Sequence, residues 1–458
     1  MIAFRTVEQR PAVVESRVIN NDANHDLMPV RSAGDPRRQL LRSVVASAVG
    51  TSIEWYDFFL YGVAAALVFP HKFFPESDPY TGTLLSFSTY FVGFAARPVG
   101  AAIFGHVGDR VGRKASLIAT LLLMGISTAI VGLVPGYDRI GVWGAVLLTM
   151  ARAAQGIGVG GEWGGAVLLS AEWGDRRRRG FLTSWTQFGS PAGMVLANGT
   201  LALMTYVSGP QFLTWGWRVP FLFSLVLVAV GLYIRVGILE TPVFARLRAE
   251  GRIERLPVYE VVRRNWREVL VTALVRTGQQ APFYIFTTYV LTYATRTLHL
   301  NQGTVLNFVM LQALLSLATI PLCGHLSDII GRRRTTAIGC LVMIVWPFAY
   351  FRLLDSGHLG LIFLAILIGL PLHDLQYGPQ AALIVESFPS QLRYSGASLG
   401  YQLASITAGG PAPLIALWLF RTFGTSTAIA AYLSTAAVIS LVALSRLQER
   451  SQAELDAR

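Results

Sequence analysis

Gly105-His106-Val107-Gly108-Asp109-Arg110-Val111-Gly112-Arg113-Lys114 is the stretch that decides the fold, because a similar stretch occurs again later in the chain. The second copy is Gly324-His325-Leu326-Ser327-Asp328-Ile329-Ile330-Gly331-Arg332-Arg333. Three further pairs of identical residues are separated by nearly the same number of positions as the two copies. These pairs are Glu172 with Glu386, Gly180 with Gly396, and Gln187 with Gln402. The simplest explanation is a chain made of two homologous halves.

Both copies lie between long apolar segments. Of the 458 residues, 53% are hydrophobic and only 14% are charged, against about 25% charged in an ordinary soluble domain. Runs of about 20 apolar residues are long enough to cross a bilayer as helices. The composition excludes a soluble enzyme and predicts an all-α membrane protein. We expect twelve transmembrane helices in two pseudo-symmetric six-helix bundles, at about 43–69, 82–106, 115–134, 141–170, 181–206, 215–237, 268–295, 303–325, 335–353, 359–386, 394–419 and 425–445.

The basic residues are concentrated in alternate loops. The formal net charge is +12, from 38 Lys and Arg against 26 Asp and Glu, and the loops on one side hold most of these cations. Cytoplasmic loops keep the excess of Lys and Arg, so we expect both termini in the cytoplasm. Charge spread over short loops, without a single basic patch, does not predict nucleic-acid binding.

Breaks in the apolar pattern divide the chain into five parts. The longest interior polar stretch, 239–267, is expected to be a cytoplasmic linker with short amphipathic helices. Residues 42–238 and 268–446 are then the two bundles, and 1–41 and 447–458 are cytoplasmic tails. Cys323 and Cys340 lie in apolar segments without metal-ligand spacing, which indicates small core residues and no metal site.

Several carboxylates lie inside the expected spans, where a charge costs about 2.5 to 3.5 kcal/mol. Glu54 and Asp57 are three residues apart and share a helix face. Mutual repulsion and burial favour a protonated form, so we consider both as proton-coupling residues. Glu162 and Asp374 are further candidates, the latter in a relay with His373. The alternative is that these acids form structural ion pairs with membrane arginines, such as Arg152 for Glu162.

Membrane arginines are candidates for binding an anionic substrate, because the planar guanidinium binds a carboxylate in bidentate fashion. We favour Arg97 and Arg276, which could instead form salt bridges to Glu54 or Asp57. Prolines and neutral polar residues in spans seven and ten suggest broken helices that line a cavity. Neutral candidates for substrate binding are Gln155, Gln280, Tyr284, Tyr377 and Gln380.

The repeated loop resembles the signature loop of the major facilitator superfamily. Other stretches resemble its metabolite:proton symporter branch: 50–59 in span one, 96–100 in span two, 155–163 in span four and 240–244 after span six. The resemblance covers about 40–445 and implies the major facilitator fold in the cell inner membrane. It also implies proton symport of small organic anions or zwitterions.

The loop motifs also suggest a cytoplasmic gate. Asp109 can bind the N-terminus of a neighbouring helix, and Arg113 can pair with Glu172. The alternative is that these cations only set the topology. The second copy has Ile329 where the first has Arg110. If Arg110 takes part in a gating contact, the second copy forms a weaker gate. The gating candidates are Asp109, Arg110, Arg113, Glu172, Asp328, Arg332 and Glu386.

Energy sources other than a gradient are disfavoured. No Gly-x-x-x-x-Gly-Lys-Ser/Thr phosphate loop is present, and neither His-Glu-x-x-His nor Gly-x-Ser-x-Gly occurs. We therefore expect no enzyme activity and no cofactor beyond the proton gradient. The leading interpretation is a monomeric secondary transporter that carries a small organic acid with protons by alternating access. Proline or betaine uptake, a sugar facilitator and a non-transporting membrane sensor are the alternatives.

Overall fold

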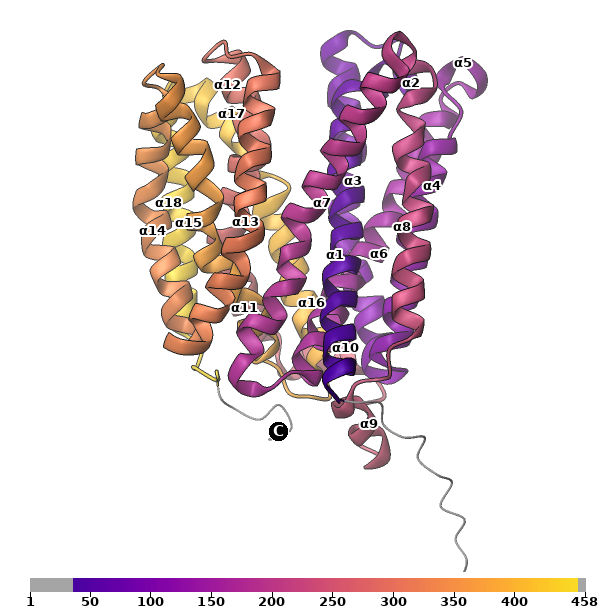
Figure 1. Cartoon of the computed structure of the whole chain (residues 1–458), viewed down its shortest axis with the longest axis vertical. Coiled ribbons are helices and arrows are strands. Elements are labelled where there is room, and N and C mark those ends of the chain that lie inside the picture. Colours follow the sequence, from indigo (N-terminus) through magenta and orange to yellow (C-terminus); the bar gives the residue numbers. More distant parts are fainter. Residues whose placement is uncertain (1–35, 452–458) are drawn as a thin grey trace, which may run out of the picture.

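The computed structural model describes residues 36–451, and every regular element in that range is a helix. The expected tails 1–41 and 447–458 lie largely outside the described residues. Figure 1 shows two helical bundles side by side. The first bundle holds α1 (Pro36–Leu67), α3 (Pro79–Arg110), α4 (Arg113–Leu133), α6 (Trp143–Trp173), α7 (Arg179–Ser208) and α8 (Arg218–Val236).

The second bundle repeats this arrangement. Its long helices are α11 (Trp266–Tyr284) continued by α12 (Val290–Arg296), α13 (Gln302–Ile330), α14 (Arg332–Leu354), α15 (Leu359–Val385), α16 (Arg393–Ala404) continued by α17 (Ala412–Phe423), and α18 (Ser426–Leu444). Two short helices, α9 (Pro242–Ala249) and α10 (Pro257–Arg264), lie in the stretch between the bundles. They lie at the lower end of the molecule in Figure 1. The short helices α2 (Phe69–Phe73) and α5 (Tyr137–Ile140) lie in loops at the opposite end.

The long helices make twelve passes, six in each bundle, as the sequence predicts. Eight spans within 36–451 are long and apolar enough to cross a membrane by composition alone. The other four passes, α1, α6, α7 and the α11–α12 pass, contain the buried polar residues Glu54, Glu162, Gln187 and Arg276. Buried charged and polar side chains in a span are those that face the interior of the protein rather than lipid.

Glycines bring α3 and α6 into backbone contact. A Cβ on Gly160 would clash with the carbonyl oxygen of Arg97, and one on Gly156 would clash with that of Gly93. No side chain fits at these points, so the glycine-rich stretch of α6 is required for this packing.

The expectation of broken helices is correct for one span and wrong for another. A π-helical turn, η4 (Ile285–Tyr289), follows Pro282 and interrupts span seven. Span ten is not broken, because α15 runs continuously through Pro371 and Pro379. Instead the break lies in span eleven, at the π-helical turn η5 (Ser405–Gly409).

Candidate functional site

Three buried charged side chains, drawn from both bundles, lie close enough for the two cations to act electrostatically on the acid. Glu54 on α1, Arg97 on α3 and Arg276 on α11 are each no more than 3% exposed. The charges of both arginines act on the Glu54 carboxyl. None of the three forms an ion pair within residues 36–451, and Glu54 Oε2 has no hydrogen-bond partner there. The site therefore combines one acid with two cations that no ion pair neutralises in the described part of the chain.

Arg97 lies against aromatic rings. Its guanidinium carbon is 5.0 Å from the ring centroid of Phe58 and 4.8 Å from that of Phe94. These cation–π contacts stabilise the charge without using its hydrogen-bond donors.

Arg276 is held by the second bundle. Its Nη1 donates to the carbonyl oxygen of Tyr401 at 2.5 Å and to the Ser405 hydroxyl at 2.9 Å. The guanidinium carbon lies 3.2 Å from the Tyr401 ring centroid, and Trp163 stacks on the same ring at 3.6 Å. Two groups this close to one ring lie on its opposite faces. Because Trp163 belongs to α6, this stack joins the two bundles. The indole Nε1 of Trp163 also donates a hydrogen bond to Gln187 on α7.

Asp57 lies in a different environment from Glu54. Its Oδ2 accepts a hydrogen bond from Thr128 at 2.7 Å, and Thr128 accepts one from Gln155 at 2.7 Å. Arg152 completes the chain by donating to Gln155 at 2.5 Å. The first bundle thus connects Asp57 to a buried cation through two neutral side chains, and the shared helix face does not bring Asp57 and Glu54 to the same partners.

Glu162 forms an ion pair with Arg235 on α8, with both side chains buried. It also accepts a hydrogen bond from Thr120 at 2.8 Å. The partner is therefore Arg235 and not Arg152, which sequence reasoning had considered.

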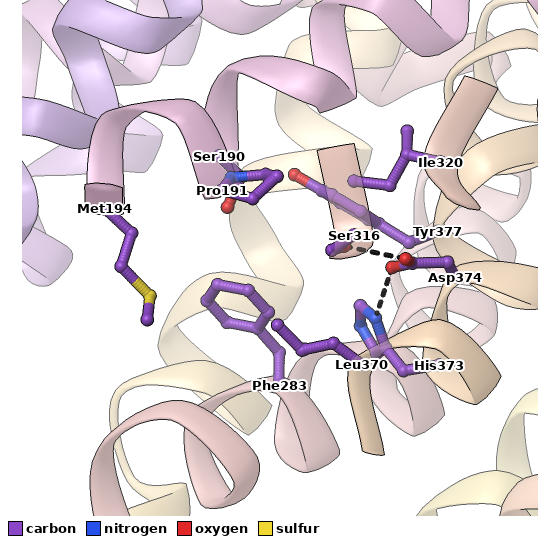
Figure 2. Close-up of a pocket in the computed structure, with 10 residues that line it drawn as sticks. All are labelled: Ser190, Pro191, Met194, Phe283, Ser316, Ile320, Leu370, His373, Asp374 and Tyr377. Atoms are coloured by element: carbon purple, nitrogen blue, oxygen red, sulfur yellow. Dashed lines mark hydrogen bonds and ion pairs between the residues drawn. The ribbon is translucent and has the colours of Figure 1, made fainter. Parts of the chain in front are cut away.

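A pocket between the two bundles has an acid and a histidine in its wall (Figure 2). Asp374 accepts hydrogen bonds from Ser316 at 2.6 Å and from Thr319, and contacts His373 Nδ1 at 3.2 Å. The other ring nitrogen of His373 contacts Gln279 at 2.7 Å. The lining residues are Ser190, Pro191 and Met194 from α7, Phe283 from α11, Ser316 and Ile320 from α13, and Leu370, His373, Asp374 and Tyr377 from α15.

The remaining neutral candidates divide between two places. Tyr377 lines the pocket, and Gln280 and Tyr284 lie on α11 beyond Arg276. Gln380 is buried on α15 but is not among the lining residues. The structure thus brings Arg276, Gln280 and Tyr284 together, while Gln155 belongs with Asp57.

The first loop motif forms a network across the two bundles, which we call the first latch. The Asp109 carboxylate accepts hydrogen bonds from the backbone N–H groups of Tyr394 and Ser395, at the start of α16, at 3.2 and 2.9 Å. Further contacts are Asp109 to Arg113 at 3.1 Å, Arg113 to Glu172 at 3.8 Å and Arg393 to Glu172 at 3.6 Å.

The second loop motif forms the same network with the bundles exchanged, which we call the second latch. Asp328 accepts hydrogen bonds from the N–H groups of Gly180 and Phe181, at the start of α7, at 2.9 and 2.8 Å. Further contacts are Asp328 to Arg332 at 2.7 Å, Arg332 to Glu386 at 3.7 Å and Arg179 to Glu386 at 2.9 Å. Burial raises the pKa of the Glu386 carboxyl above its usual value, against the opposing charges of Arg332 and Arg179.

Arg110 does not take part in the first latch. It is exposed, as is Ile329 at the matching position of the second copy. The difference between the two copies at this position therefore changes the surface and leaves the latches equivalent.

Each motif loop is also bound by a glutamate that lies just after the last helix of the same bundle. Glu240 accepts hydrogen bonds from the N–H groups of Arg113 and Lys114, at 3.2 and 3.3 Å. Glu449 does the same for Arg332 and Arg333, at 3.2 and 2.9 Å. A carboxylate at a helix N-terminus is stabilising, so α4 and α14 are capped alike.

Sequence reasoning missed Arg179 and Arg393 as latch partners. The signal was present, because these two residues are separated by the same number of positions as Glu172 and Glu386. It also missed Tyr401 and Arg235, which no motif marks, and the stacking role of Trp163, although that residue ends the family-like stretch 155–163.

Comparison with known proteins adds a family. The sequence model of a family described as the Major Facilitator Superfamily matches residues 47–408. The inner membrane metabolite transport protein YhjE of Escherichia coli (strain K12) is 43% identical, over 88% of this chain and 92% of that protein. The shikimate transporter of the same strain is 39% identical, over 90% and 95%.

Zwitterion transporters are similar as well. The glycine betaine/proline/ectoine/pipecolic acid transporter OusA of Dickeya dadantii (strain 3937) is 35% identical, over 88% of this chain and 82% of that protein. Among solved structures, the proton:xylose symporter XylE bound to 6-bromo-6-deoxy-D-glucose has a TM-score of 0.76 at 17% identity, over 92% of this chain and 98% of that one. That likeness supports the fold.

Proposed function

This chain belongs to the major facilitator superfamily, and from that premise we propose that it carries a small organic acid across the membrane together with protons. It is a multi-pass inner-membrane transporter and not an enzyme. The observation that supports an organic acid is the buried group of Glu54, Arg97 and Arg276, which draws on both bundles.

Competition for the two arginines supplies the coupling. While Glu54 is ionised, its charge offsets Arg97 and Arg276 and weakens their attraction for an anion. Protonation removes that charge, and the cations then bind a substrate carboxylate. A proton and an anion therefore enter together, and proton loss on the alkaline side releases the anion.

The latches would close one end of the molecule while the site faces the other. Breaking the contacts of Asp109 with α16 and of Asp328 with α7 separates the bundles at that end. Alternation between the two states is movement of one bundle against the other around the central site.

The OusA likeness makes zwitterion uptake the second candidate. A quaternary ammonium is best bound by aromatic rings with no cation nearby. Here Arg97 occupies the faces of Phe58 and Phe94, so the geometry favours the acid.

Glu54→Gln tests the coupling. We expect the variant to lose accumulation driven by an inside-alkaline pH gradient in liposomes, because a neutral amide cannot release a proton. It should keep exchange of labelled for unlabelled substrate at equal pH. Labelled 2-oxoglutarate, citrate, succinate, shikimate, proline and betaine form the substrate panel, with and without a protonophore.

Glu250→Gln is the matched control, because Glu250 lies on the surface in an exposed ion pair with Arg252. If Glu54→Gln accumulates substrate under the pH gradient as well as this control does, Glu54 is not the coupling residue. Asp57→Asn would then be the next variant to measure.

A further inference from the structure

The short helix α10 exposes apolar side chains along one side. Leu256 precedes the helix, and Tyr259 and Val262 lie within it. All three are exposed, by 57% to 59%. They follow one another every three positions and are therefore neighbours on the helix surface. The other side of α10 is packed against the protein, since Val261 is fully buried. Within residues 36–451, nothing covers the exposed side.

This exposed surface continues into a membrane span. Only Asn265 separates α10 from α11. From the start of α11, Trp266, Leu270 and Leu274 recur every four residues, and each is at least 36% exposed. An exposed apolar stripe on a membrane span faces lipid, and a tryptophan at the end of a span is typical of the membrane–water interface. We infer that α10 lies at the level of the bilayer surface.

Arginines flank the apolar surface. The side chains of Arg263 and Arg264, at the end of α10, are 64% and 61% exposed. Arg255 before the helix and Arg267 after it are exposed as well. The one acid among them is Glu260, which lies 2.6 Å from Arg264 and 4.0 Å from Arg263. Four cations against one acid give this segment a net charge of +3.

The combination of apolar and cationic side chains specifies the chemistry of a partner. The two kinds of group even share one place, because the guanidinium carbon of Arg267 lies 5.4 Å from the ring centroid of Trp266. A helix at the membrane surface binds through buried apolar side chains and through attraction between basic residues and anionic headgroups. The planar guanidinium also suits a phosphate group. A water-soluble acidic partner would satisfy the arginines but not a row that continues along the lipid-facing side of α11.

We propose that α10 and its flanking residues form a binding site for anionic phospholipid. The arginines bind the phosphate, and the acyl chains lie along Tyr259, Val262 and Trp266. This site is separate from the central site and does not depend on which solute is carried. Because α10 packs against α3 and α16, the two helices that the first latch joins, the bound lipid lies beside a contact between the bundles.

Energy transfer from the native tryptophans to dansyl-labelled lipid measures the preference of the full chain for an anionic headgroup. The protein is reconstituted in phosphatidylcholine bilayers that contain a trace of dansyl phosphatidylglycerol or of dansyl phosphatidylcholine. We expect the anionic probe to bind at least about fivefold more tightly. Added salt should reduce this difference, because it screens exposed charges.

Arg255→Gln combined with Arg263→Gln should lower the preference for the anionic probe at least about fivefold. The matched control is Arg177→Gln combined with Arg178→Gln, which removes two exposed arginines from the loop before α7. Equal binding of the two probes to the unaltered protein would overturn the proposal. An equal effect of the two double variants would overturn it as well, because charge alone and not the α10 surface would then attract the lipid.

A spin label at Val262→Cys tests the apolar half of the site. We expect the label to collide more often with oxygen, which dissolves in lipid, than with a water-soluble nickel complex. A label at Arg177→Cys should show the reverse order. If the Val262 label favours the nickel complex, α10 faces water and the proposal is wrong. Spin–spin broadening at Val262 would show that a second copy of the chain covers the surface, which would also overturn the proposal.

Discussion

Arg235 and Glu162 show how strongly a single residue can depend on one partner inside the membrane. Both side chains are buried and each is the other's ion-pair partner. Removing one partner leaves an uncompensated charge, which costs about 3 to 5 kcal/mol in a buried pair. We expect Arg235→Gln to lower the melting temperature of the purified protein markedly.

The double variant Glu162→Gln with Arg235→Gln is the control for the pair. Because it leaves no unpaired charge, it should melt above the Arg235→Gln single variant. A double variant that melts no higher than the single one would show that the cost does not come from the orphaned carboxylate. If the double variant still accumulates substrate, Glu162 has no role in coupling.

At the scale of elements, the contact between α7 and α13 depends on glycine. A Cβ on Gly180 would lie 2.6 Å from the carbonyl oxygen of Gly324. We expect Gly180→Ala to push the two helices apart and weaken the second latch. Spin labels at Arg177→Cys and Arg334→Cys, one on each bundle, should then report longer distances. The native Cys323 and Cys340 are buried and will not compete for the label.

Gly199→Ala on the same helix is the control, since a Cβ there meets nothing within 4 Å. It should leave the distance distribution unchanged. Equal effects of the two alanines would mean that helix propensity, and not the contact with α13, governs the change.

At the scale of the whole molecule, pH should shift the equilibrium between the closed and the open form of the latched end. Burial raises the pKa of Glu386 while the latch is closed, and exposure to water on opening returns it toward its ordinary value. The closed form therefore binds a proton more readily, so acid favours closure and a rise in pH through this interval favours opening. The same spin labels should show a growing long-distance population as pH rises.

Glu386→Gln should flatten this response, because the amide does not titrate. Arg332, Arg179 and Glu449 all act on the carboxyl and stay in place in the variant. A closed population that grows with rising pH in the unaltered protein would contradict the assignment.

These scales also explain what could be predicted from sequence. The passes follow from long apolar runs, and the latch acids follow from a repeated motif whose spacing is local. Pairing between distant helices is not local: nothing in α6 indicates that Glu162 meets Arg235, or that Trp163 stacks on Tyr401. Likewise, the prolines of α15 suggest a break, yet the helix runs through both of them without interruption.

The exchanged arrangement of the two latches has a consequence for robustness. Each bundle contributes one aspartate to bind the other bundle's helix, and each motif loop is tied to its own bundle by Glu240 or Glu449. The closed end is therefore held by two separate latches, and a glutamate fixes the motif loop of each one. We therefore expect the loss of one latch to leave the other engaged, so that the two bundles stay joined at this end.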